Sequence, residues 1–354
     1  MPHATNHPIT DAAGAESELP QAVRALPVSV LDLATVRPEE GVRATFEASV
    51  ALARDAERWG YTRYWFAEHH NMATVASSAT AVLIGHIAEH TSTMRVGAGG
   101  IMLPNHSPLV IAEQFGTLET MYPGRIDLGL GRAPGGDMAM LRSLRREPHD
   151  SDRFPQDVAE LQSLLGPERP GQEVRATPGT GTEVPLYILG SSLFGARLAA
   201  AMGLPYAFAS HFAPAALVDA VTAYRTEYQP SEKHPEPYVI AGLNVFVADT
   251  DDEAADLHHA ALRTMVTRLV RRGTELSEAD ADAILSSPAG DQVRTMLRYS
   301  AVGSPAALPE QVASFVTHAQ ADEVIVTSNT PTAQARHRSY ELLAEALGLE
   351  ARDA

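Results

Sequence analysis

Short apolar runs alternate with longer segments of helical periodicity along most of the chain. The runs are nearly continuous in hydrophobic residues, which is typical of strands buried on both faces in a parallel sheet covered by helices. The predicted strands are 28–33, 61–67, 94–103, 125–131, 184–190, 206–210, 238–248 and 322–328. The predicted helices are 42–59, 78–90, 108–121, 192–202 and 215–228, with further helical material before residue 165.

Eight strands separated by helices predict how the chain is closed. We expect an α/β protein, a (β/α)8 TIM barrel, rather than a doubly wound open sheet. About 70 residues separate the seventh and eighth strands, which is more than one helix needs. The excess, 271–309, is expected to be an insertion on the rim that carries the other strand-to-helix loops, where lids are often formed. The barrel is predicted to be one domain over 26–350, after a disordered tail at 1–25.

Composition and charge argue against several classes of function. The formal net charge is −17, whereas binding to nucleic acid or to an anionic membrane needs clustered Lys and Arg. The absence of cysteine removes thiolate nucleophiles and Cys-ligated metals. The first 25 residues lack the basic start and apolar core of a signal peptide, and no later segment has about 18 uninterrupted apolar residues. We therefore expect a cytoplasmic protein with neither nucleic acid nor a membrane as a partner.

Glu68, His69 and His70 follow the second predicted strand, and in a barrel the residues after the strand ends converge on one mouth. Imidazole titrates near neutral pH, so a histidine there can act as a general acid or base, with Glu68 fixing its tautomer. Neighbouring residues of an extended segment point in opposite directions, so His69 and His70 are not expected to bind one metal ion. A hydrogen-bonded histidine that stabilises a loop is the alternative.

Two glycines lie toward the end of the third predicted strand, and an arginine follows the fourth. Gly99 and Gly100 would let a flat aromatic ligand approach the backbone, and a bulge or tight bend at the rim explains them equally well. Arg132 offers a fork of donors for a phosphate or carboxylate, and we favour that role. A salt bridge to Asp127 or Asp137 is the rival interpretation for Arg132.

A strand, Gly190 and then Ser191 and Ser192 lead into the helix predicted from residue 192. Free backbone N–H groups and two hydroxyls at a helix N-terminus favour negative charge, although either serine could be a simple N-cap. A glycine-rich fingerprint for a dinucleotide is missing, because "GAGG" lacks the downstream glycine and helix. Ser210 and His211 follow the sixth predicted strand and complete the polar residues at the strand ends.

Several long motifs resemble the bacterial luciferase-like flavin-dependent monooxygenase family, in its single-component luciferase-like subgroup. They are "YWFAEHH", "VGAGGIMLPNHSPLVIAEQFGTLETMYPGRIDLGLGRAPGG", "YILGSS" and "GLPYAFASHF", and the likeness extends over about residues 26–347. The resemblance implies a (β/α)8 barrel that holds FMN at its mouth. It further implies that reduced FMN, supplied by a separate NAD(P)H flavin reductase, reacts with O2 to oxidise a small organic substrate through a flavin C4a-peroxide.

Two other activities are consistent with the same motifs. One is an oxidoreductase that uses the deazaflavin F420, in which hydride transfer replaces oxygen chemistry. The other is a non-catalytic protein that binds FMN as a carrier or sensor. No metal is expected with any of these functions, and a homodimer through the second and third predicted helices is implied by the resemblance.

The resemblance also implies roles for individual residues. His69 matches the catalytic histidine, which assists proton transfer near the flavin, and Gly99 and Gly100 match a strand end against the isoalloxazine ring, often with a cis peptide between them. The residues that match the phosphate site or line the flavin are Arg132, Ser191, Ser192, Ala67 and Gly131. Luciferase itself has a reactive cysteine in place of Gly131 and an acidic residue in place of Ser191. Neither of these two roles is therefore carried over, and no motif of this sequence supports light emission or a long-chain aldehyde pocket.

Overall fold

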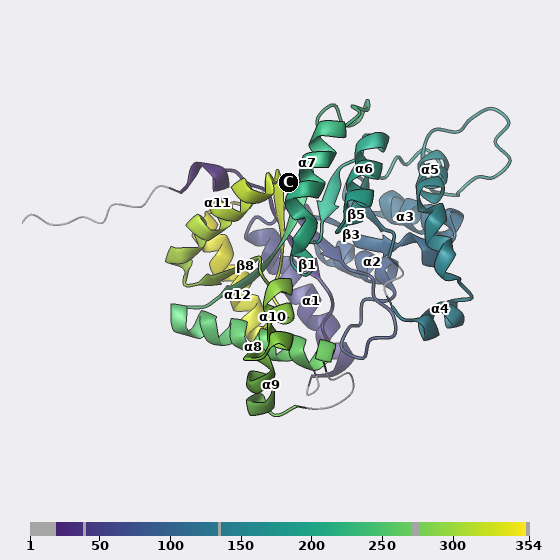
Figure 1. Ribbon diagram of the computed structural model, residues 1–354. Coiled ribbons are helices and arrows are strands. Elements are labelled where there is room, and N and C mark those ends of the chain that lie inside the picture. Colours follow the sequence, from purple (N-terminus) through teal and green to yellow (C-terminus); the bar gives the residue numbers. More distant parts are fainter. Residues whose placement is uncertain (1–18, 38–39, 134–135, 271–275, 352–354) are drawn as a thin grey trace, which may run out of the picture.

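Eight parallel strands close into a ring in the computed structural model, which describes residues 19–37, 40–133, 136–270 and 276–351 (Figure 1). The order around the ring is β1-β2-β3-β4-β5-β6-β7-β9, and β9 pairs with β1. The strands are β1 (Val28–Asp32), β2 (Arg63–Phe66), β3 (Arg95–Met102), β4 (Ile126–Gly131), β5 (Leu186–Gly190), β6 (Tyr206–Phe208), β7 (Val239–Val247) and β9 (Glu323–Thr327). Each corresponds to one predicted strand, so the predicted TIM barrel is confirmed.

The connecting helices cover the outside of this ring (Figure 1). The helices are α1 (Gly41–Arg58), α2 (Thr80–His90), α3 (Pro108–Met121), α4 (Met138–Leu144), α5 (Phe154–Leu165), α6 (Leu193–Met202), α7 (Leu217–Glu227), α8 (Asp251–Val270), α9 (Glu278–Leu285), α10 (Pro288–Met296), α11 (Leu308–Ala319) and α12 (Ala333–Leu347). Short 3-10 turns are η1 (Gln21–Val23), η2 (Leu103–Asn105), η3 (Pro148–Arg153), η4 (Pro214–Ala216) and η5 (Pro305–Ala307). Within the described ranges, none of these helices has the length and apolar character needed to cross a membrane.

Apolar side chains pack on both sides of the ring because the strands alternate their side chains between its two faces. The larger cluster lies between the strands and the outer helices and includes Tyr64, Phe66 and Phe115, all fully buried. A smaller cluster fills the inside of the barrel and consists of Leu31, Trp65, Ala67, Tyr187, Ala207, Ile240 and Ile325. The inside of the barrel is therefore a packed core and leaves the strand ends as the place for a site.

Buried charges pair with one another at the amino-terminal ends of the strands. Arg63, the first residue of β2, donates to Glu323 Oε1 and Oε2 at 2.7 and 2.9 Å, and to Asp127 Oδ2 at 2.8 Å. Arg95 donates to the other oxygen of Asp127 at 2.6 Å, and Tyr238 donates to Glu323 at 2.8 Å. The charges are matched, and we call this network of Arg63, Arg95, Asp127, Tyr238 and Glu323 the barrel floor.

A ninth strand, which the sequence analysis did not predict, lies in the predicted insertion at 271–309. β8 (Ser300–Gly303) pairs in parallel with Asn244–Val247 of β7, beyond the part of β7 that pairs with β6. Residues 271–275 lie outside the described residues, and α9 and α10 pack on α8 through a small cluster that includes Val266 and Leu285. The predicted lid therefore contains an extra strand and two helices, and its closing function stays a prediction.

The domain begins before residue 26, where the predicted tail was to end. Residues 1–18 of that tail lie outside the described residues. The remainder is packed, because η1 contacts α11 and the side chain of Val23 is 2% exposed. The sequence pattern missed this segment since a three-residue turn has too few positions to show a period.

Candidate active site

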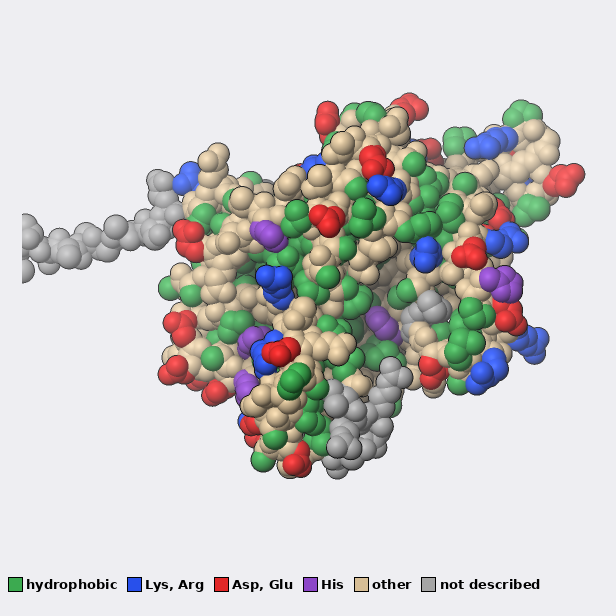
Figure 2. All heavy atoms as spheres, viewed as in Figure 1, with side chains coloured by type: hydrophobic (Ala, Val, Ile, Leu, Met, Phe, Trp, Pro, Cys, Tyr) green, Lys and Arg blue, Asp and Glu red, His purple; other side chains and the backbone are tan. Residues whose placement is uncertain are grey.

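The carboxyl ends of the ring strands lie at one rim because all eight strands are parallel. The loops that follow β2, β4, β5, β6 and β9 therefore share the rim opposite the barrel floor. Figure 2 shows a hollow in the surface between the α4 and α8 regions, with hydrophobic side chains and a histidine side chain in it. The candidate residues of the sequence analysis are all found on strands or loops that end at this rim.

His69 follows β2 with its imidazole turned into the protein. Its Nδ1 atom is buried and has no hydrogen-bond partner among the described residues. Burial lowers the pKa of His69, against the opposing effects of the Glu68 carboxylate and the Ala67 carbonyl, while the charge of Arg268 lowers the pKa further. The imidazole is therefore neutral at neutral pH, which leaves one ring nitrogen able to accept a proton.

Glu68 does not hold His69, contrary to the expectation that it fixes the tautomer of the catalytic imidazole. Its carboxylate accepts hydrogen bonds from His70 Nε2 at 2.7 Å, His106 Nε2 at 2.8 Å and the backbone N–H of Met102 at 3.1 Å. Burial opposes the charge, but the two histidines and the Met102 N–H outweigh it and lower the pKa of Glu68 to about 2. Since neighbouring residues of an extended chain point apart, His70 faces Glu68 and leaves His69 free.

Glu68, His70 and His106 also form a group whose ligand atoms lie within 4.8 Å of one another, close enough for one metal ion. Each imidazole already has the Glu68 carboxylate as its partner. The hydrogen bonds alone account for the cluster, which joins the loops after β2 and β3. The expectation that no metal is bound stays a prediction.

His211 is a second imidazole at the rim, in the loop after β6, and its Nδ1 is also buried without a partner among the described residues. Burial lowers the pKa of His211 to about 4, and the charge of His69 lowers it in the same direction. Gly242 of β7 makes room for this ring, because a Cβ at residue 242 would lie 2.4 Å from His211 Nδ1. The two imidazoles thus approach one site from β2 and β6.

Ser328 adds a third polar atom without a partner. It follows β9 directly, and its Oγ is buried with no hydrogen bond to any described residue. Buried polar atoms in proteins are nearly always hydrogen-bonded, so each exception calls for an explanation such as a ligand. His69, His211 and Ser328 come from three separate strand ends, and their atoms without a partner among the described residues make this rim the candidate binding site.

Arg132 lies against the start of α6. Its guanidinium carbon is 4.3 Å from the ring centroid of Phe194, the second residue of that helix, in a cation–π contact. The rival salt bridges are not formed, because Asp127 is bound by Arg63 and Arg95. Asp137 instead caps α4 through the Met140 N–H at 2.9 Å and contacts Asn71. The Arg132 side chain is therefore available to a ligand.

Ser191 and Ser192 stand between β5 and α6. Ser192 is the N-cap residue by position, yet its side chain makes no capping hydrogen bond. The hydroxyl of Tyr206 donates to the Ser192 carbonyl at 3.1 Å and fixes the turn. The uncapped N–H groups of α6, two serine hydroxyls and the nearby Arg132 make an arrangement suited to a phosphate.

Gly99 and Gly100 are joined by a cis peptide bond at the carboxyl end of β3. The pairing of β3 with β4 shifts between Ala98 and Ile101, so the bulge that the sequence allowed is present. A Cβ at Gly99 would lie 2.9 Å from Leu31 Cδ1, and one at Gly100 would lie 2.9 Å from the backbone of Gly129. Packing alone requires both glycines, and contact with a flat ligand stays a prediction.

The other two predicted residues lie at neighbouring strand ends. Ala67 directly follows β2 and is 6% exposed, as part of the apolar cluster inside the barrel. Gly131 ends β4 and pairs with Met102 of β3. A Cβ at Gly131 would lie 3.2 Å from Met102 Sδ. Both positions therefore have room only for small residues beside the mouth.

Comparison with known proteins identifies the family. The model of the luciferase-like monooxygenase family matches residues 26–322. The chain belongs to the luciferase-like monooxygenase family. Among curated relatives of this luciferase-like monooxygenase, YvbT of Bacillus subtilis is 47% identical over 90% of the chain and 96% of its own length. A luciferase-like monooxygenase of Escherichia coli K12 is 46% identical over 89% and 95%. N-acetyl-S-alkylcysteine monooxygenase of Bacillus subtilis is 30% identical over 90% and 98%.

Solved structures share the fold of this luciferase-like monooxygenase. Apo-MsnO8 is 34% identical with a TM-score of 0.84, covering 92% of the chain and 99% of MsnO8. The oxygenating constituent of 3,6-diketocamphane monooxygenase of Pseudomonas putida, in complex with FMN, has a TM-score of 0.70 at 17% identity over 91% and 97%. An F420-dependent secondary alcohol dehydrogenase has a TM-score of 0.64 at 15% identity over 93% and 99%. The last two likenesses concern the fold alone.

The sequence analysis missed two polar residues of this luciferase-like monooxygenase rim. His211 was recognised at a strand end but given no role, and Ser328 was not singled out. The available signal was their position directly after an apolar strand, where a polar residue faces the mouth. What the sequence could not provide is the missing partner, which depends on the residues packed around each side chain.

Proposed function

We propose that the protein is a flavin-dependent monooxygenase that uses reduced FMN and O2 to oxidise a small organic substrate, with His69 as the acid or base. The observation that carries the proposal is the set of buried polar atoms at the rim that have no partner among the described residues, with the His69 imidazole among them. A buried imidazole nitrogen without a hydrogen bond is unfavourable, and a ligand that forms this bond would stabilise it. A neutral imidazole can also transfer a proton to or from such a ligand.

The rim suits FMN in particular because it combines an anion site with a flat, apolar one. Arg132, the N–H groups at the start of α6 and the hydroxyls of Ser191 and Ser192 would hold the phosphate. The strand end at Gly99 and Gly100 would lie along the isoalloxazine ring. Ala67 and Gly131 would line it, since larger side chains there would occupy the space.

Reduced FMN supplies the electrons that activate O2 when it is bound. The protein's own contribution is to orient the flavin, to exclude water and to control one proton. The apolar cluster of Leu31, Trp65 and Ile240 keeps the barrel interior dry below the site. His69, neutral because burial lowers its pKa, can accept a proton at one nitrogen and donate one from the other.

Two partners are part of the proposal. The missing dinucleotide fingerprint is consistent with a separate NAD(P)H flavin reductase that supplies reduced FMN. A homodimer through α2 and α3 is supported by the exposed apolar side chains of Val82, Val110 and Met121 on those helices. Sedimentation of the protein at micromolar concentration tests the dimer, and a monomer at that concentration contradicts it.

FMN binding is the first test, measured by the change in flavin fluorescence as protein is added. Arg132→Gln should weaken FMN binding by about 10- to 100-fold, as expected when a charged hydrogen-bond donor is lost. Arg197→Gln is the matched control, because Arg197 lies on α6, the helix that Arg132 contacts, and is already paired with Glu227. A protein that binds F420 and not FMN would contradict the proposal and favour hydride transfer.

Turnover is the second test, with FMN, a flavin reductase and NADH supplied to a panel of thioethers, ketones, aldehydes and aromatic polyketides. Products that gain one oxygen atom from O2 are the expected result, detected by mass spectrometry with 18O2. His69→Ala should keep the FMN affinity and lower product formation by about 100-fold or more. FMN binding without any oxygenated product would favour the non-catalytic carrier, and unchanged turnover in His69→Ala would remove His69 from the mechanism.

A further inference from the structure

Arg268, in the last turn of α8, is a partly buried cation without a counter-ion. Its Nε atom is buried and has no hydrogen-bond partner, and its guanidinium forms no ion pair with any residue that the structure describes. Burial lowers the pKa of Arg268, and no carboxylate among the described residues offsets that effect. Buried charges in proteins are nearly always paired, so this guanidinium lacks an anion.

Another arginine of α8 has the carboxylate partners that Arg268 lacks among the described residues. Arg263, little more than one turn earlier, donates to both oxygens of Asp282 at 2.7 and 2.5 Å and to Glu278 at 2.7 Å. Both acids lie on α9, so Arg263 joins α8 to α9. Arg268 has no such partner in the described part of α9 or α10, which indicates that its charge serves something other than helix packing.

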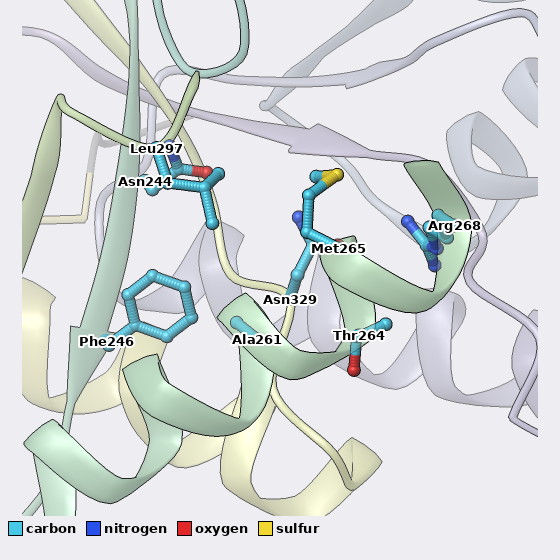
Figure 3. A pocket seen from close by; sticks show the side chains of 8 residues that line it. All are labelled: Asn244, Phe246, Ala261, Thr264, Met265, Arg268, Leu297 and Asn329. Carbon is cyan, nitrogen blue, oxygen red and sulfur yellow. The ribbon is translucent and has the colours of Figure 1, made fainter. Parts of the chain in front are cut away.

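The surroundings of Arg268 are neutral. It lines a pocket together with Asn244, Phe246, Ala261, Thr264, Met265, Leu297 and Asn329 (Figure 3). None of these neighbours is acidic. Two of them carry amides, and the Asn244 amide already donates to the carbonyls of His211 and Tyr299. Figure 3 shows Arg268 beyond Met265 on α8, with Asn244 reaching in from the β7 strand.

Arg268 also acts on the candidate catalytic residue. Its charge is one of the influences on His69, so the two side chains are within electrostatic range of each other at the mouth. Arg132 lies at another part of the rim, where β4 ends and α6 begins. The rim thus offers two cationic groups, one at the helix N-terminus suited to a phosphate and one within electrostatic range of the His69 imidazole.

We propose that Arg268 binds a carboxylate of the substrate and that the enzyme oxidises small organic acids. The planar guanidinium fork matches a carboxylate, and an anion held there would lie within electrostatic range of His69, the proposed acid or base. The inference rests on the proposed function for the identity of the reaction. The anion site itself can be tested without turnover.

The test is calorimetric titration of the protein with matched acids and amides: butanoate, hexanoate and octanoate against butanamide, hexanamide and octanamide. Each titration is run on the free protein and on the FMN-loaded protein. The wild-type protein should bind the acid of at least one pair about 10- to 100-fold more tightly than the amide. Arg268→Gln should abolish this preference, and Arg268→Lys should keep part of it because the charge remains.

Arg263→Gln is the matched control, because it removes a paired arginine from the same helix and should leave the preference unchanged. Circular dichroism and thermal midpoints establish that each variant is folded. Wild-type protein that shows no preference for acids in any pair, or Arg268→Gln that retains the preference, overturns the proposal.

Measurement of FMN affinity distinguishes the two anions that Arg268 could bind, the flavin phosphate and a substrate carboxylate. Arg268→Gln should leave FMN affinity within twofold of the wild type, whereas Arg132→Gln should lower it. If Arg268→Gln weakens FMN binding and leaves the preference for acids intact, Arg268 holds the flavin phosphate and the substrate assignment is wrong. If the wild type binds no FMN, the proposed function fails, while titration of the free protein still decides whether Arg268 holds a carboxylate.

Discussion

Replacing Glu68 with glutamine tests whether the loops after β2 and β3 are held by one carboxylate. Glu68 is 1% exposed and accepts hydrogen bonds from two imidazoles and one backbone N–H. Glutamine keeps the shape of the side chain, but it removes the charge and turns an amide donor toward groups that are themselves donors. The change therefore leaves buried donors unpaired without creating a cavity.

The expected loss of stability follows from the pKa. Glu68 has a pKa of about 2 in the folded protein, against about 4.3 for an ordinary glutamate, which corresponds to roughly 3 kcal/mol of stabilisation. Because the folded pKa is the lower one, this stabilisation is fully present above about pH 4.3 and is lost as the pH falls toward 2. Glu68→Gln should cost about 3 kcal/mol at pH 7 and progressively less in acid.

Urea unfolding of both proteins between pH 7 and pH 3, followed by circular dichroism, measures this difference. Glu47→Gln is a suitable control, because Glu47 is paired with Arg43 on the exposed face of α1 and should change stability by less than about 1 kcal/mol. A loss below about 1 kcal/mol for Glu68→Gln at pH 7, or a loss that does not shrink on acidification, would refute the reasoning.

Three further predictions concern the floor and the second imidazole. Arg63→Met should lower the free energy of unfolding by about 3–5 kcal/mol, since it leaves Glu323 and Asp127 short of a buried partner; an unchanged urea midpoint would contradict this. Gly242→Ala should cost about 1–3 kcal/mol, because the new methyl group would overlap the His211 ring; thermal melting measures it, and wild-type stability would show that the ring moves freely. His211 has a pKa of about 4 when folded and about 6.5 when unfolded, so stability should fall by up to about 3 kcal/mol from pH 6.5 toward 4, and His211→Asn should flatten that dependence in the same urea measurements.

The sequence predicted the ring of strands well for a physical reason. A strand buried on both faces must be apolar at successive positions, and such a run can be read without knowing its neighbours. β8 escaped prediction because it has four residues, two of them partly exposed, and it exists only as a continuation of the sheet along β7. Its formation depends on the length of β7, which is a property of the assembled barrel.

The candidate site was predictable to the extent that position along a strand determines which rim a residue reaches. Position placed His69 and Arg132 at the mouth, but it could not reveal that Glu68 serves His70 and His106 instead of His69. The His106 partner is 38 residues away in the sequence. The unpaired charge of Arg268 could not be predicted either, since it depends on how α8, α9 and α10 pack.

The paired charges of the barrel floor close the barrel at its amino-terminal end. Asp127 and Glu323 are fully buried and Arg63 is nearly so, which leaves the base sealed by groups already engaged with one another. Any ligand must then enter and leave at the opposite end of the barrel, so substrate entry and product release use the same opening. Substitutions in the barrel floor should therefore alter thermal stability, while substitutions around the open end should alter which ligands bind.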